Sequence, residues 1–145
     1  AGLSKDDLKV NESIPYVDIK PHPWRTLKTK SSIRKVPLVG ASLWSARRIL
    51  GNDNDSPFAF PLYANEKITN SNSASEALNK WLRNRLGEGN VIHGFRHSMR
   101  DRLRAVECLS DLIDQIEGWS RRSVGEGYGK GYDLKVLLRW LDKVI

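Results

Sequence analysis

The sequence predicts an α+β domain that is mainly helical, with a small antiparallel β-hairpin near the N-terminus followed by a helical bundle. Two observations predict this fold. The β-prone segments gather in residues 14–38, and from about residue 41 onward apolar residues recur at helical spacing. With 145 residues, of which 39% are hydrophobic and 28% charged, the chain suits one globular domain with its own core.

The strand signals come first along the chain. The segment IPYVDIK, residues 14–20, is a short β-prone run. After it, WRTLKT (24–29) and IRKVPLV (33–39) flank the polar turn KSS (30–32). Two such runs around a polar turn predict that residues 24–29 pair with 33–39 in a hairpin. Pro37 suits the end of a strand, because proline has no N–H to donate to a neighbour.

Helical spacing of apolar residues and the glycines that end it define the remaining elements. We expect a serine before residue 76 to cap the second helix, Ser110 to cap the fourth, and Asp133 to begin the last. The leucine-rich stripe of the last helix would pack either onto its own domain or onto a neighbouring subunit. The expected helices are 41–50, 76–86, about 95–106, 112–118 and 134–145.

The charge of the chain indicates its class of partner. Net charge is +7, from 24 Lys and Arg against 17 Asp and Glu, with a pI of about 9.7. Such a field attracts nucleic acid, although a basic surface without a partner is the alternative. No apolar run approaches the ~18 residues of a membrane span, and the start has no signal segment. Cys108 is a single cysteine, which predicts a reducing, cytoplasmic setting and an inert, partly buried thiol.

The stretch IHGFRHSMRDRL, residues 92–103, carries the first candidate site residues. Arg96 offers a planar fork of donors that fits two phosphate oxygens, and His93 lies three residues earlier, near a helix start that favours anions. A neutral imidazole there could accept a proton from an attacking hydroxyl. In the alternative interpretation, His93 caps the helix and Arg96 pairs with Asp101 or Glu107.

Tyr128 is the candidate nucleophile. It lies nine residues after Trp119, between glycines in GEGYGKG, and such flanks would let a tyrosine reach a phosphate and withdraw. The alternatives are a surface tyrosine without function, or Tyr132 as the nucleophile. No GK[ST] phosphate loop and no Cys/His or carboxylate cluster with metal spacing is present, so we expect no cofactor and no metal. A zinc site built from His22, His93 and His97 is the remote exception.

Four elements in order resemble the tyrosine recombinases, the phage-type integrases. HGFRH, then GW, then Tyr nine residues on is similar to the family's H-x-L-R-H, G-H or G-W, and nucleophilic tyrosine. LKTKSSIRKVPL resembles the hairpin that carries the family's catalytic lysine, and GLSKDDLKV resembles the segment after its first catalytic arginine. The resemblance covers nearly the whole chain.

The resemblance implies a role for each matching residue. Tyr128 would form the 3′-phosphotyrosyl link, Arg96 would stabilise the transition state, and His93 would assist proton transfer. Lys28 would protonate the leaving 5′-oxygen, and Trp119 would donate its N–H where many members have His. Lys30 is the alternative to Lys28, and His97 is expected to hold the local fold. The residues expected to contact the DNA backbone are Lys30, Arg121 and Arg122, with Arg47 and Arg48 as weaker candidates.

The function implied is site-specific DNA recombination, the integration or excision of a phage or genomic island, by an enzyme with the DNA breaking-rejoining fold. Its partners would be double-stranded DNA attachment sites and other protomers, as a tetramer on DNA, in the cytoplasm at the nucleoid and without a membrane. Residues 1–145 would then be a partial catalytic domain without the first arginine and the N-terminal DNA-binding domains, and would cleave DNA poorly. The alternatives are a catalytically silent DNA-binding or oligomerisation module and a type IB topoisomerase-like enzyme.

Overall fold

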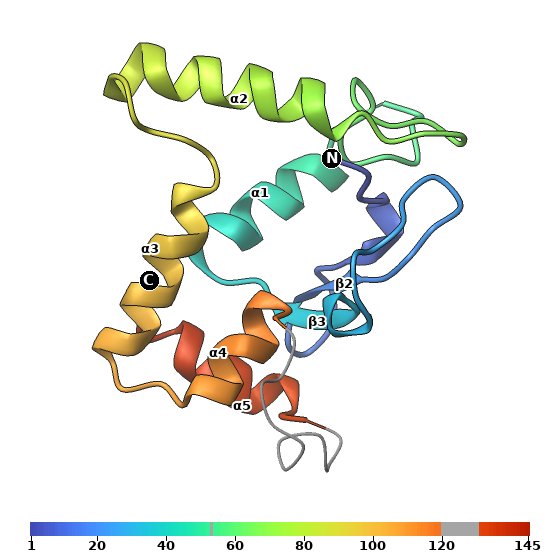
Figure 1. The fold of residues 1–145 in the computed structure, drawn as a ribbon. Helices are drawn as coiled ribbons and strands as arrows, with labels where there is room; N and C mark the ends of the chain where they lie inside the picture. The colour runs from blue at the N-terminus through green and yellow to red at the C-terminus, as the bar shows by residue number, and fades with distance from the viewer. Residues whose placement is uncertain (53, 120–130) are drawn as a thin grey trace.

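The computed structural model describes residues 1–52, 54–119 and 131–145, which form a small α+β domain (Figure 1). A three-stranded antiparallel sheet lies beside the described helices, and the predicted fold class is confirmed at this level. The elements are η1 (Lys5–Asp7), β1 (Leu8–Lys9), β2 (Tyr16–Ile19), η2 (Lys30–Ser32), β3 (Arg34–Pro37), α1 (Gly40–Leu50), α2 (Ser71–Leu86), α3 (Gly94–Ala105), α4 (Ser110–Glu117) and α5 (Leu134–Leu141), where η denotes a 3₁₀ helix.

The sheet differs from the predicted hairpin. Its order is β1-β2-β3, and β3 pairs with β2 in the register Tyr16↔Pro37, not with residues 24–29. The predicted pairing is wrong because the backbone bends tightly at 22–25, where His22 and Arg25 exchange both backbone hydrogen bonds. The indole of Trp24 also donates to the Gly2 carbonyl, which holds this segment against the N-terminus.

The sequence predicts which residues begin or cap three of the helices, and two of these three predictions are wrong. The side chain of Asn70, rather than a serine, accepts the Ser73 N–H at 3.1 Å and starts α2 five residues before the expected position. Ser110 is the first residue of α4 and makes no capping bond. Asp133 accepts the Val136 N–H at 2.9 Å and begins α5, as predicted.

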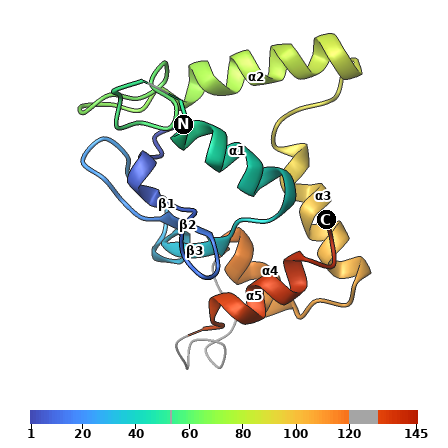
Figure 2. The ribbon, with the colours of Figure 1, turned by 180° about the vertical axis from the view of Figure 1, so that it is seen from behind.

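The larger core lies where α3, α4 and α5 meet β3 (Figures 1 and 2). Leu137 and Leu141 of α5 are buried in this core, so the stripe of the last helix packs onto its own domain. Cys108 is buried here too, and burial raises the pKa of its thiol, as expected for an inert cysteine. The buried members are Leu103, Cys108, Leu112, Ile113, Ile116, Leu137, Leu141 and Val144.

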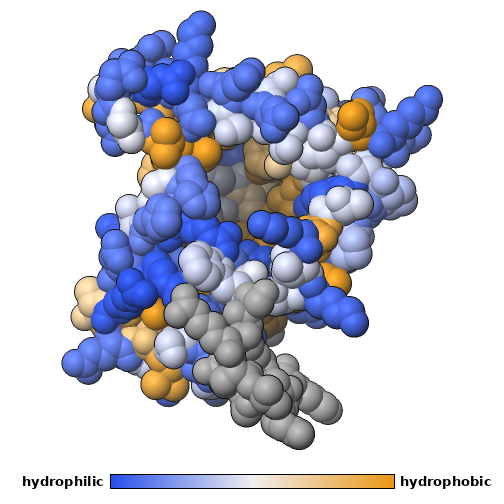
Figure 3. Space-filling model, in the orientation of Figure 1, coloured by the Kyte–Doolittle hydropathy of each residue, from blue (hydrophilic) through white to orange (hydrophobic). Residues whose placement is uncertain are grey.

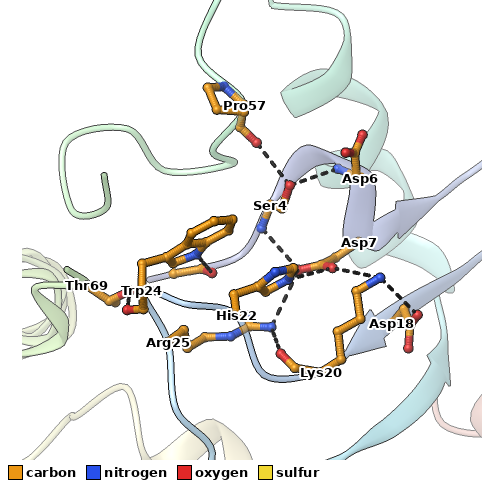
Figure 4. Close-up of polar contacts among 11 residues, drawn as sticks. Ser4, Asp6, Asp7, Asp18, Lys20, His22, Trp24, Arg25, Pro57 and Thr69 are labelled. Atoms are coloured by element: carbon orange, nitrogen blue, oxygen red, sulfur yellow. Dashed lines mark hydrogen bonds and ion pairs between the residues drawn. The ribbon is translucent and has the colours of Figure 1, made fainter. Parts of the chain in front are cut away.

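A polar cluster fixes the long connection between β2 and β3 (Figure 4). Asp7 is fully buried, and its carboxylate accepts hydrogen bonds from the Ser4 backbone N–H at 3.1 Å and from His22 Nε2 at 2.9 Å. Arg25 Nη2 lies 3.5 Å and Lys20 Nζ 3.7 Å from the same carboxylate. We call these five residues the buried-aspartate cluster. These contacts hold residues 20–25 against η1 and thereby fix the position from which residues 26–33 continue.

The face of the molecule drawn in Figure 3 is mostly hydrophilic and is hollowed beneath α2. Among the helices in the described ranges, none has the length and apolar character needed to cross a membrane.

Candidate functional site

A cavity of about 600 Å³ lies between the loop before β3, the start of α3 and the end of α4. We call it the α3–α4 pocket. It brings together four residues predicted from the sequence, Lys28, His93, Arg96 and Trp119. The other predicted residues Tyr128, Arg121 and Arg122 lie outside the described residues. Its lining residues are Lys28, Thr29, Ser32, Arg34, His93, Arg96, Glu117, Gly118 and Trp119.

Arg96 reaches the pocket from the first turn of α3. Its Nη2 donates to the backbone carbonyl of Glu117 at 2.7 Å, and its guanidinium carbon lies 5.4 Å from the centroid of the Trp119 ring. Asp101 pairs with Arg104 instead, at 3.7 Å, and Glu107 forms no ion pair with Arg96 in the described part of the chain, so the alternative in which Arg96 pairs with Asp101 or Glu107 is wrong. Within residues 1–52, 54–119 and 131–145, no carboxylate forms an ion pair with Arg96.

His93 precedes α3 and is exposed at the pocket. His93 is the N-cap residue of α3 by position, but its backbone is already helical, at φ −66° and ψ −24°, and its ring makes no capping hydrogen bond, so its side chain does not cap the helix. The ring stands edge-on to that of His97, with centroids 4.9 Å apart. His97 therefore contacts the candidate base directly, which fits the supporting role expected of it.

The end of α4 holds Trp119. Arg100 Nη1 donates to Glu117 Oε2 at 2.9 Å, and its guanidinium carbon lies 4.5 Å from the centroid of the Trp119 ring. The indole Nε1–H of Trp119 is buried and has no hydrogen-bond partner in the described part of the chain. A buried donor without an acceptor costs about 1–3 kcal/mol. This N–H is therefore a donor that an external oxyanion could satisfy.

Arg34 belongs to the same pocket, although no sequence motif indicates a role for it. Its Nε donates to the Ile116 carbonyl and its Nη1 to the Ser32 carbonyl, both at 2.9 Å. Burial and the nearby charge of Arg96 lower the pKa of Arg34, and Glu117 partly opposes that shift. Strand alternation could have found it, since Arg34 shares a face of β3 with Val36, which packs against the larger core.

The two hairpin lysines occupy different places. Lys28 is exposed at the α3–α4 pocket, whereas Lys30 begins η2 and lines a neighbouring cavity of about 1030 Å³. Tyr132, the alternative nucleophile, also lines that neighbouring cavity. Its hydroxyl donates to Asp111 Oδ2 at 2.7 Å, and its backbone N–H donates to Gln115 Oε1 at 2.8 Å. These bonds hold Tyr132 against α4.

The remaining candidate residues lie elsewhere. Arg47 and Arg48 are exposed on α1, with the Arg48 guanidinium 5.0 Å from the centroid of the Trp44 ring. His22 belongs to the buried-aspartate cluster and is bonded to Asp7, so the structure does not assemble the three-histidine zinc site. The described residues contain no group of three or more His, Cys, Asp or Glu side chains that could hold a metal ion.

The chemistry of the α3–α4 pocket follows from its charges. Arg34, Arg96 and Lys28 supply three cations, and no described carboxylate forms an ion pair with any of them. Among the described lining residues the only acid is Glu117, which is bonded to Arg100. Cations with unsatisfied donors, an indole N–H and a titratable imidazole are suited to a phosphate group whose oxygens gain charge during reaction.

Comparisons with protein-family models, with curated proteins and with solved structures found no match to this chain.

Proposed function

We propose that this chain is the catalytic part of a tyrosine recombinase, with the DNA breaking-rejoining fold, that cuts and rejoins DNA at specific sites. The observation that supports this proposal is the convergence of Lys28, His93, Arg96 and Trp119 in one pocket. These residues come from three segments far apart in the sequence. Sequence motifs alone predict all four, and the neighbouring cavity that Lys30 and Tyr132 line does not hold them all.

In the proposed reaction a DNA phosphodiester binds in the α3–α4 pocket, with Arg96 and the Trp119 N–H donating to its non-bridging oxygens. The Tyr128 hydroxyl oxygen attacks phosphorus, and its proton passes to His93. The bond from phosphorus to the 5′-oxygen breaks, and Lys28 gives that oxygen a proton. The products are a 3′-phosphotyrosyl link and a free 5′-hydroxyl end.

Rejoining reverses these steps with a 5′-hydroxyl from another strand. The covalent link conserves the energy of the broken phosphodiester, so strand exchange needs no nucleotide cofactor. The partners are double-stranded DNA attachment sites and further protomers of the same protein on the DNA. The net charge of +7 favours that association.

The test uses the full-length protein that carries this sequence and a nicked DNA substrate whose short 5′-hydroxyl fragment diffuses away after cleavage. We expect a protein–DNA adduct that resists denaturant, forms without added metal and maps to Tyr128. The Tyr128→Phe variant should form none. Tyr132→Phe is the matched control, since it removes a neighbouring tyrosine hydroxyl that bonds Asp111, and it should form the adduct.

Two results would contradict the proposal. An adduct that maps to Tyr132 and persists in Tyr128→Phe would show that Tyr132, and not Tyr128, is the nucleophile. Tight, salt-dependent binding to the cognate site without any adduct would identify a silent DNA-binding module instead.

A further inference from the structure

We propose that Arg34 is a positioning residue, which holds the loop that carries Lys28 against the Gly118–Trp119 turn and so places the general acid. This inference rests on the proposed function and adds a residue to its site.

The first observation is a bridge between two distant parts of the chain. Arg34 Nη1 bonds the carbonyl of Ser32, in the loop that includes Lys28, and Arg34 Nε bonds the carbonyl of Ile116, in the last turn of α4. Both bonds are 2.9 Å long, and the second joins residues 82 positions apart. One side chain therefore links the lysine loop to the end of the helix that leads to Trp119.

The second observation is the glycine that follows α4. Gly118 has φ 72°, a left-handed conformation that favours glycine, and a Cβ built there would overlap the Arg34 guanidinium. The guanidinium therefore lies directly on the backbone of the turn. It also satisfies a carbonyl in the last turn of α4, where a cation is favourable.

The third observation is the electrostatic cost of this arrangement. Burial and the charge of Arg96 both act against a cation at Arg34, as the lowered pKa of its guanidinium indicates. A lysine could not make the same contacts, because the two carbonyls need donors in the fixed directions of a planar fork. The position thus requires an arginine for its geometry.

The fourth observation concerns Lys28 itself. It is exposed, and within the described ranges it makes no hydrogen bond or ion pair of its own. Its side chain therefore has no anchor beyond the path of its loop. Since catalysis by a general acid depends on near-contact geometry, the loop's attachment through Arg34 determines how well Lys28 reaches the leaving oxygen.

The experiment compares two substrates in the full-length protein. One is the nicked DNA with its normal 5′-oxygen leaving group, and the other replaces that oxygen with sulfur, whose thiolate leaves without protonation. Lys28→Ala should slow adduct formation by about 10²-fold on the oxygen substrate and far less on the sulfur substrate. Arg34→Lys should show the same pattern, slowed by roughly tenfold to 10²-fold on oxygen and rescued by sulfur.

Three variants keep the test decisive. Gly118→Ala displaces the guanidinium without changing Arg34 and should give the same sulfur-rescued defect, so the test does not rest on Arg34→Lys alone. Lys35→Ala removes the adjacent cation, which lies over the Tyr16 ring, and should behave as wild type on both substrates. Arg96→Ala should slow both substrates alike, because its role is at the phosphate.

The outcomes separate the two proposals. Equal slowing of both substrates in Arg34→Lys would overturn the positioning role, and so would unchanged rates on both. Rapid adduct formation in wild type together with a sulfur-rescued Lys28→Ala would uphold the proposed function whichever way the Arg34 variants behave. The absence of any adduct in wild type on either substrate would refute the proposed function, and the role of Arg34 with it.

Discussion

Two clusters of charged side chains in this domain have opposite arrangements of charge. In the buried-aspartate cluster an acid is at the centre, and its carboxylate is surrounded by a backbone N–H and by three basic side chains (Figure 4). In the α3–α4 pocket the cations Lys28, Arg34 and Arg96 face a cavity, and the acid in the lining is bonded to Arg100 outside the cavity.

The difference shows how the same residue types serve a fold or a ligand. The charges of the buried-aspartate cluster are satisfied within the protein, so its role is to fix the connection between β2 and β3. The arginines of the α3–α4 pocket are held by backbone carbonyls, which orient a guanidinium without neutralising it. Oriented cations that keep their charge are ready for an external anion.

The largest expected effect is on catalysis. Arg96→Ala in the full-length protein should slow adduct formation by roughly 10²–10³-fold, because one preorganised donor to the reacting phosphate is lost. Single-turnover cleavage measures this rate, and thermal unfolding followed by circular dichroism reports stability. A rate within a few-fold of wild type would show that the pocket is not where charge develops.

A substitution in the buried-aspartate cluster should instead lower the stability of the fold. Asp7→Asn leaves Lys20, His22 and Arg25 without their buried carboxylate, so it should lower the free energy of unfolding by roughly 3–5 kcal/mol. Urea denaturation of the chain measures that free energy. Asp18→Asn is the matched control, because it removes only a partly exposed ion pair to Lys20 and should cost about 1 kcal/mol or less. Equal losses in both variants would contradict the central role of Asp7 in the buried-aspartate cluster.

Trp119→Phe separates binding from stability at one residue. It keeps an aromatic ring beside Arg96 and Arg100 but removes the unpaired indole N–H. We expect the free energy of unfolding to change by no more than about 1 kcal/mol, because removal of a buried donor that has no partner among the described residues offsets the packing that the smaller ring loses. Binding of a short DNA duplex should nevertheless weaken, as measured by fluorescence anisotropy. A large loss of stability with unchanged binding would indicate that the N–H has an internal role.

Cys108 provides the smallest effect, at a buried group outside both clusters. Burial raises the pKa of its thiol in the folded state, so the unfolded chain loses this proton first as pH rises. Its contribution to stability is therefore present below the unfolded pKa of about 8.5 and declines as pH increases through the folded pKa. Cys108→Ala should flatten the dependence of unfolding free energy on pH above that value. An unchanged slope would contradict this assignment.

The sequence was informative where local patterns decide structure. Helical spacing located α1 and α3 to within about a residue, and the motif residues Lys28, His93, Arg96 and Trp119 meet in one pocket. The strand pairing could not be predicted in the same way, because it depends on Asp7 and on Trp24, which bind segments distant in sequence and bend residues 22–25.

Arg34 illustrates the same limit within the site. Its alternation with Val36 indicates an inward-facing side chain. Its partners, however, are the backbone carbonyls of Ser32 and Ile116, and every residue has such a carbonyl, so the sequence does not identify them. The carbonyl partner of Arg96 gives no sequence signal for the same reason, and the sequence offers Asp101 or Glu107 as partners instead.

Whether the α3–α4 pocket binds a DNA phosphate is tested by an NMR titration of the five tryptophan indole N–H signals with a short DNA duplex. We expect the Trp119 signal to move downfield as its N–H gains a phosphate acceptor, and we expect Arg96→Ala to abolish the shift. The Trp24 signal, whose N–H already donates to the Gly2 carbonyl, should stay in place. A Trp119 signal that does not move when the duplex binds would contradict the assignment of the α3–α4 pocket as the phosphate site.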